Sequence, residues 1–161
     1  MNVRLIANTT SYVLWVEAGF LLLPLAASVL YGEAWLPFFG TAVLCVLLGT
    51  ALHLVPVKKA QMHSRDGFMA VALGWIALSL TGALPYVFTG ALTDYVDAVF
   101  ETVSGLTTTG STVFPEVEHL PRSILLWRSL TQWMGGMGVL VLFLALLHKL
   151  WDGAVYQMRA E

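Results

Sequence analysis

The segment SGLTTTGSTV, residues 104–113, carries uncharged hydroxyl residues on both sides of Gly110 and a second glycine, Gly105, near its start. Backbone carbonyls in such a strand can replace the water shell of a monovalent cation, and glycine allows the backbone conformations that direct those carbonyls toward the ion. The predicted ligands are the carbonyls of Thr108, Thr109 and Ser111 around Gly110, with the hydroxyls as additional ligands. By itself the string TTTGST is also typical of an ordinary polar loop. Whether it is an ion-binding segment therefore depends on the structural elements predicted on either side of it.

The other residue patterns do not indicate a catalytic, metal-binding or phosphate-binding site. Carbonyl coordination requires no carboxylate, and none lies between Thr102 and Pro115. The 4 histidines lack metal-ligand spacing, and neither a nucleophile–base pair nor a phosphate-binding glycine loop occurs, which argues against an enzyme. A net charge of −2 does not indicate a nucleic-acid partner. The acidic residues around the segment are expected near an outer mouth, where they would raise the local cation concentration: Asp94, Asp97, Glu101, Glu116 and Glu118.

The amino-acid composition indicates whether the chain folds in water or in a membrane. It has 161 residues, of which 58% are hydrophobic and 11% charged, and its mean hydropathy is +0.77. Soluble domains carry about 25% charged residues, so the chain is predicted to be an integral membrane protein. Four apolar runs approach the ~20 residues of a spanning helix: 13–31, 35–57, 68–88 and 129–147.

Two residues inside these runs need an interpretation. Glu17 is expected to reach the inner membrane interface, with proton coupling as the alternative. Cys45 is expected to be a small apolar residue. The first run is predicted to be a retained helix rather than a cleaved signal peptide.

The basic residues predict the orientation. The loop 58–67 carries Lys58, Lys59 and Arg65 and is therefore predicted to be cytoplasmic. Alternating spans then place both termini in the cytoplasm if the segment between the third and fourth runs enters and leaves on the outer side. In this arrangement only Arg122 and Arg128 lie outside.

A short helix is predicted just before the glycine-containing segment. Asp94 is a plausible N-cap, and Asp97 adds negative charge to the first turn. Residues 95–106 would be about 18 Å long, roughly half of the hydrocarbon thickness, so this helix could dip into the membrane and let the chain return. Its apolar residues fall on one face: Val96, Val99, Phe100, Val103 and Leu106.

The fourth run contributes residues that could support the segment. Arg128 is expected to pair with Glu101 or Glu116 or to extend to the interface; holding the loop, together with Thr107 and Thr112, is the alternative. Gly135, Gly136 and Gly138 favour close helix packing over a hinge.

Two long strings carry a family resemblance. DAVFETVSGLTTTGSTV and LPRSILLWRSLTQWMGGMGVLVL, preceded by RDGF, ALGW and GALPY, resemble the first pore repeat of the TrkH group in the Trk/Ktr/HKT superfamily of potassium transporters. The resemblance implies an all-α fold: a transmembrane helix pair at 1–57, one M1–pore helix–filter–M2 repeat with a re-entrant loop at 68–150, and a cytoplasmic tail at 151–161. It implies potassium uptake across a bacterial inner membrane, with K+ held at Thr108, Thr109, Gly110 and Ser111. K+ is then the substrate, with no covalent cofactor, and a TrkA-like nucleotide-binding protein is an implied cytosolic partner.

The chain departs from this family in one respect, because the family joins four such repeats around one pore and this chain contains one. Self-assembly, the remaining repeats of a longer or split transporter, and a non-conducting fragment or assembly module all stay open. A Na+/K+ pathway is a further alternative. The lipid bilayer is a partner in each case, and no nucleic acid is expected.

Overall fold

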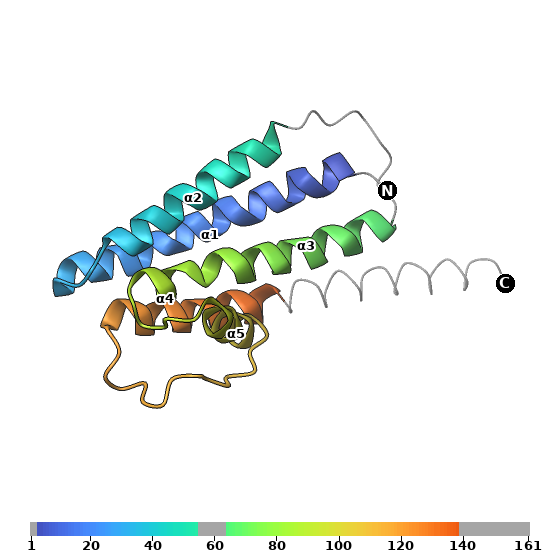
Figure 1. Cartoon of the computed structure of the whole chain (residues 1–161). Coiled ribbons are helices and arrows are strands. Elements are labelled where there is room, and N and C mark those ends of the chain that lie inside the picture. Colours follow the sequence, from blue (N-terminus) through green and yellow to red (C-terminus); the bar gives the residue numbers. More distant parts are fainter. Residues whose placement is uncertain (1–2, 55–63, 139–161) are drawn as a thin grey trace.

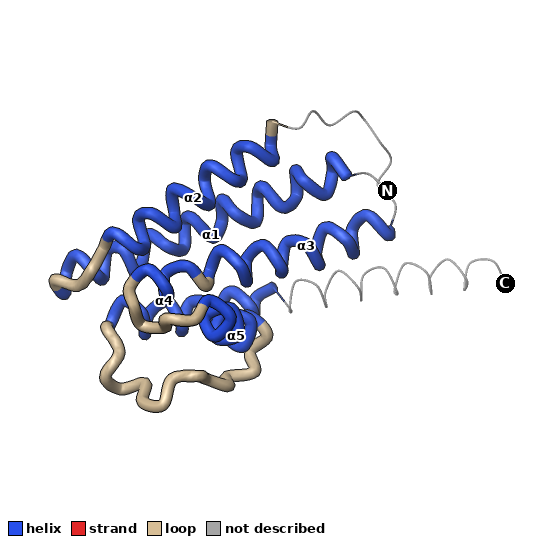
Figure 2. Tube along the Cα trace, viewed as in Figure 1, coloured by secondary structure: helices blue, strands red, loops and turns tan. Residues whose placement is uncertain are grey.

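The computed structural model describes residues 3–54 and 64–138, and every regular element in these ranges is a helix (Figure 2). In chain order they are α1 (Val3–Tyr31), α2 (Leu36–His53), α3 (Ser64–Gly82), α4 (Leu84–Phe88) and α5 (Tyr95–Leu106). A further helix begins at residue 122 and continues to residue 138, where the description ends; we call it the last helix. α1 packs against α2 and α3, and α5 lies across the long helices, so that it is seen end-on in Figure 1.

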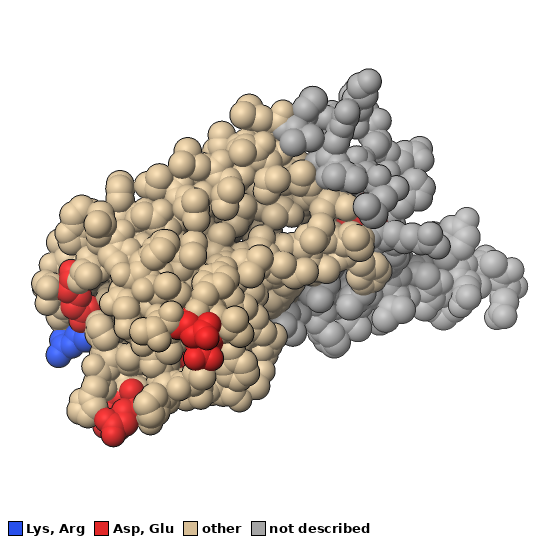
Figure 3. Space-filling model, in the orientation of Figure 1, with Lys and Arg blue, Asp and Glu red and all other residues tan. Residues whose placement is uncertain are grey.

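Three helical segments are long and apolar enough to cross a membrane: Ile6–Tyr31, Leu36–His53 and Asp66–Phe88. They coincide with the first three predicted spans, and the prediction of an all-α membrane protein is confirmed for the described residues. The charged side chains visible in Figure 3 gather mostly toward the end formed by the connecting loops, while the surface over the long helices is nearly free of charge. Residues 129–138 of the fourth predicted span belong to the last helix, whereas its remaining residues, the tail and most of the loop 58–67 lie outside the described residues.

α1 begins ten residues before the predicted start of the first span, at Val3 rather than at residue 13. The polar stretch there is absorbed into the helix because its hydroxyls bond to the preceding turn. Thr10 Oγ1 donates to the Ile6 carbonyl at 3.0 Å, and Ser11 Oγ donates to the Asn8 carbonyl at 2.6 Å. Hydroxyl residues can therefore continue a helix without exposing their polar groups to the surroundings.

The third predicted span is divided into α3 and α4 around Ala83. Pro85 has no backbone N–H, so the helical hydrogen-bond ladder is interrupted at this point. The Tyr86 amide donates instead to the Ala83 carbonyl at 3.2 Å, which leaves the Gly82 carbonyl without a helical donor. The Trp127 indole fills that place from the last helix, with Nε1 at 2.9 Å from the Gly82 oxygen. At this break the hydrogen bond from Trp127 to Gly82 therefore links α3 to the last helix.

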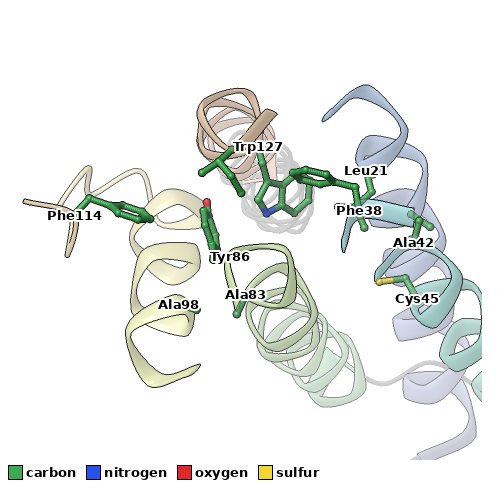
Figure 4. Packing of buried hydrophobic residues seen from close by; sticks show 11 residues of the cluster. Leu21, Phe38, Ala42, Cys45, Ala83, Tyr86, Ala98, Phe114 and Trp127 are labelled. Atoms are coloured by element: carbon green, nitrogen blue, oxygen red, sulfur yellow. The ribbon is translucent and has the colours of Figure 1, made fainter. Parts of the chain in front are cut away.

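A buried cluster connects the N-terminal helix pair to the rest of the molecule. Figure 4 shows Leu21 of α1 and Phe38 of α2 facing Trp127, which in turn lies between them and Tyr86. Trp127, Tyr86, Leu21 and Phe38 are all fully buried. The same apolar packing therefore stabilises both the helix pair and the helices that position α5.

Glu17 does not reach the inner interface, and the prediction that it does is wrong. It lies in the middle of α1, only 1% exposed. Its Oε2 atom accepts a hydrogen bond from Thr81 Oγ1 of α3 at 2.6 Å and lies 3.7 Å from Cys45 Sγ of α2. The carboxyl group can remain buried because polar partners from two neighbouring helices satisfy it. Cys45, expected to be either buried or lipid-facing, is buried.

Glu33 joins the turn between α1 and α2 to the start of the last helix. Its carboxylate accepts from the backbone amides of Arg122 at 2.7 Å and Ser123 at 2.9 Å, and from the Ser123 hydroxyl. These amides belong to the first turn of a helix, which has no internal acceptors for them. Burial tends to raise the pKa of Glu33, but the hydrogen bonds from Ser123 and Arg122 and the charge of Arg122 outweigh it and hold the pKa below its ordinary value.

Candidate ion-binding site

α5 leads directly into the glycine-containing segment and has the predicted bounds. It begins after Asp94, whose carboxylate accepts from the Val96 amide at 2.7 Å, and ends at Leu106. Asp97 lies in the first turn, where negative charge is favourable. The predicted N-cap is therefore confirmed.

The two faces of α5 are used differently from those of a helix in a soluble protein. The side chains of Val96 and Phe100 are exposed, whereas the small and polar residues face inward. The buried residues of α5 are Ala98, Glu101, Thr102, Ser104, Gly105 and Leu106. An outward apolar stripe suits a helix surrounded by lipid or by other membrane helices, because neither supplies hydrogen bonds.

The predicted ligand segment forms a tight turn at the C-terminal end of α5. The amides of Thr109 and Gly110 both donate to the Ser104 carbonyl, at 2.9 and 3.4 Å. Gly110 has φ +77°, and Thr108 has φ +56°, which is uncommon for a residue other than glycine. Gly110 is thus needed for a backbone conformation that side chains disfavour, as predicted from its chemistry.

The orientation of the carbonyls follows from these amides. In a planar trans peptide the N–H and the preceding C=O point in opposite directions. Because the amides of Thr109 and Gly110 point at Ser104, the carbonyls of Thr108 and Thr109 point away from α5. No hydrogen bond within the described residues occupies these two carbonyls.

Two other carbonyls of the segment accept hydrogen bonds. The Ser111 carbonyl accepts from Ser104 Oγ at 2.5 Å, and the Thr107 carbonyl accepts from Thr108 Oγ1 at 2.7 Å. The hydroxyls of Thr107 and Thr109 lie 2.8 Å apart. All side chains from Thr107 to Val113 are nevertheless exposed, so the segment presents one open surface.

Glu101 is not at an outer mouth, and that part of the prediction is wrong. It is 4% exposed and faces the last helix. Its Oε1 lies 2.7 Å from Arg128 Nε, which confirms the predicted pairing of Arg128 with Glu101. Glu116 is the other predicted partner, but its Oε2 atom lies 3.3 Å from Nε2 of His119 instead. Glu101 also accepts from Thr112 Oγ1 at 3.0 Å and from the Val113 amide at 3.1 Å.

The last helix approaches α5 very closely through small residues. A Cβ atom added at Gly135 would lie 2.6 Å from the carbonyl carbon of Leu106, and one added at Gly105 would lie 3.1 Å from Thr131 Cβ. The atoms nearest to added Cβ atoms at Gly136 and Gly138 are Thr108 Cγ2, at 3.8 Å, and Trp75 Cζ2, at 3.4 Å. The packing role predicted for these glycines is thus supported most strongly at Gly135.

A polar cavity of about 200 Å³ lies behind the segment. It is bordered by α5, the irregular segment that follows Gly110 and the last helix, and its polar lining includes Glu101, Ser104, Ser111, Arg128 and Gln132. Ser104 and Gln132 were not among the site residues predicted from the sequence. The spacing of Glu101, Ser104 and Gly105 is a helical i, i+3, i+4 pattern, and it could have indicated one shared face.

The sequence of the chain is similar to known cation transport proteins. Residues 37–159 match the family model TrkH, described as a cation transport protein. The chain belongs to the TrkH family. It is 39% identical over 165 residues to the Trk system potassium uptake protein TrkH of Halomonas elongata and 36% identical over 165 residues to that of Escherichia coli K12. Both alignments cover 100% of this chain and 34% of the relative.

A further relative is similar over a shorter stretch. An uncharacterized cation transporter of Methanocaldococcus jannaschii is 41% identical over 131 residues, which cover 81% of this chain and 27% of the relative. The chain thus spans about a third of the length, or less, of these relatives.

Proposed function

We propose that this chain supplies one filter segment of a potassium uptake pathway, in which K+ is bound by backbone carbonyls at Thr108 and Thr109. One observation carries the proposal: these two carbonyls accept no hydrogen bond from the described residues and point away from α5, while Gly110 at φ +77° shapes the turn. Carbonyl oxygens arranged in this way can take the place of an ion's hydration shell. The names of the relatives, as Trk system potassium uptake proteins, support K+ as the ion.

The contributions of the other predicted residues differ. Gly110 provides the conformation and its own carbonyl, and Ser111 keeps one lone pair of its carbonyl, since the other accepts from Ser104. Thr107, Thr112 and Arg128 support the loop through their hydrogen bonds. This division of roles supports Thr108 and Thr109 as the main proposed ligands.

The proposed setting is a bacterial inner membrane. α5 and the segment after it form a re-entrant loop from the outer side, and both termini lie in the cytoplasm. Ion movement is driven by the membrane potential, at about 2.3 kcal/mol per charge per 100 mV. One segment supplies part of a coordination shell, so further filter segments come from other copies or from the remaining repeats of a TrkH-type transporter. A TrkA-like cytosolic protein is the proposed regulator.

The chain offers a matched pair of glycines for the test. Gly110 and Gly90 have nearly equal positive φ angles, +77° and +74°, and an added Cβ has no close neighbour at Gly90. Gly110→Ala and Gly90→Ala therefore introduce similar backbone strain. The protein is expressed in a bacterium that lacks its own potassium uptake systems, and growth and ⁸⁶Rb+ uptake are measured at low potassium.

We expect Gly110→Ala to abolish growth and Gly90→Ala to preserve it at similar protein levels. Equal loss in both variants would contradict a filter role for Gly110. Absence of growth with the wild type, together with a monomeric mass in detergent, would contradict self-assembly and favour a non-conducting fragment or assembly module.

A further inference from the structure

One buried carboxylate touches both the last helix and the outer end of the ion-binding segment. The Glu101 side chain is 3% exposed and lies 2.7 Å from Arg128 Nε. On its other side it accepts from Thr112 Oγ1 and from the Val113 amide, at 3.0 and 3.1 Å. A carboxylate offers about four acceptor positions, and three donors from two separate elements use them here.

The hydrogen bonds continue beyond the carboxylate. Thr112 Oγ1 donates to Glu101 and accepts from the Phe114 amide at 3.1 Å. Phe114 is buried, its ring centroid lies 6.2 Å from that of Tyr86, and the Arg128 guanidinium lies over it at 5.5 Å. Residues 112–114 are therefore attached to α5 and to the last helix by polar and apolar contacts together.

The inner part of the same irregular segment, residues 109–111, is attached to α5 at Ser104, one helical turn after Glu101. Ser104 accepts the amides of Thr109 and Gly110 on its carbonyl and donates its hydroxyl to the Ser111 carbonyl. Glu101 and Ser104 are three residues apart and lie on the same face of the helix. Together they hold both ends of the irregular segment that follows the proposed ligands against the same helix, α5.

We propose that Glu101 is a positioning residue that fixes the outer half of the filter, and that Arg128 acts through it. The proposal deepens the proposed function and rests on it. Discrimination between K+ and the smaller Na+ requires the carbonyls to keep their spacing. The buried carboxylate provides that constraint, because charge-assisted hydrogen bonds are stronger than neutral ones and are not weakened by solvent in a buried site.

The test separates positioning from simple ion pairing. Glu101→Gln, Arg128→Gln and the double variant are compared with Glu118→Gln, which removes an exposed acid on the neighbouring loop. Each is purified as the full chain for melting and for hydrogen exchange of the peptide that contains Val113. Each is also assayed in potassium-uptake-deficient cells for the KM for K+ and for inhibition by Na+.

The expected results differ between the two roles. Glu101→Gln raises the KM for K+ roughly tenfold, increases inhibition by Na+, and speeds exchange at Val113 by a similar factor, since that corresponds to one charge-assisted hydrogen bond. The double variant regains the melting temperature, because no unpaired charge stays buried, but keeps the raised KM and the fast exchange. Glu118→Gln removes a charge that is expected to attract cations, and it leaves the melting temperature and the exchange at Val113 unchanged.

Recovery of both KM and exchange in the double variant would overturn the proposal, because the pair would then serve stability alone. Unchanged exchange at Val113 in Glu101→Gln would also overturn it. If the wild type takes up no potassium, the proposed function fails, and the exchange experiment still tests the positioning by Glu101 independently.

Discussion

Replacing Gly135 by alanine should force the last helix away from α5. The added Cβ would lie 2.6 Å from the Leu106 carbonyl carbon and 2.8 Å from its Cα, and closer still to the carbonyl oxygen. These are backbone atoms at the end of α5, so no rotamer change relieves the overlap. Restoring an ordinary contact of 3.4 Å to the carbonyl carbon requires a shift of about 0.8 Å.

The magnitude follows from two opposing terms. Alanine in a helix interior stabilises by up to about 1 kcal/mol relative to glycine. Overpacking against a rigid neighbour typically costs about 1–3 kcal/mol, and backbone contact favours the upper end of that range. Gly136→Ala gains the same helix propensity but meets only Thr108 Cγ2 at 3.8 Å. The two variants should therefore differ by about 2–3 kcal/mol in the free energy of unfolding.

The assay is thermal unfolding in detergent, followed by tryptophan fluorescence. A chain of this size shifts by about 2–4 °C per kcal/mol, so Gly135→Ala should melt roughly 4–12 °C below Gly136→Ala. It should also reduce ⁸⁶Rb+ uptake, because Leu106 directly precedes the proposed filter segment. Melting temperatures that agree within about 2 °C would refute the close approach of the two helices.

Two further predictions concern the other buried or partly buried carboxylates. The pKa of Glu33 is lowered in the folded state, so its contribution to stability should be complete above the ordinary value of 4.5 and should disappear as the pH falls through the lower folded value. Melting of Glu33→Gln and the wild type should therefore differ at pH 7 and converge in acid; a gap that stays constant down to pH ~3 would contradict the role of the charge. Glu17→Gln, which keeps the shape and the hydrogen bond to Thr81, should melt close to the wild type. Glu17→Ala should lose about 2–3 kcal/mol through the cavity and the lost hydrogen bond, and equal losses in both variants would show that charge is the decisive property.

Local signals account for the parts of the fold that the sequence predicted. The bounds of α5 follow from the Asp94 cap and from helical periodicity, both of which depend on residues within one or two turns. The first three spans follow from hydropathy over about 20 residues. The start of α1 was missed because Thr10 and Ser11 look like an interruption until their hydroxyls are seen to bond to the preceding turn.

Carboxylates were the least predictable residues. Glu17 and Glu101 were assigned to the interface and to an outer mouth, and both are buried. Glu33 was not assigned at all, although it covers the first amides of the last helix. A carboxylate can be buried only where donors satisfy it, and the sequence around it does not reveal whether another helix brings such donors.

The sequence alone therefore determined the membrane environment, the half-length helix and the position of Gly110, because hydropathy, capping and backbone preference act over short stretches of chain. Only the tertiary structure decided which polar groups meet. Glu101 pairs with Arg128 across 27 positions, Glu17 with Thr81 across 64, and Glu33 with Ser123 across 90. Such contacts depend on how the helices pack, and no short stretch of the sequence specifies that packing.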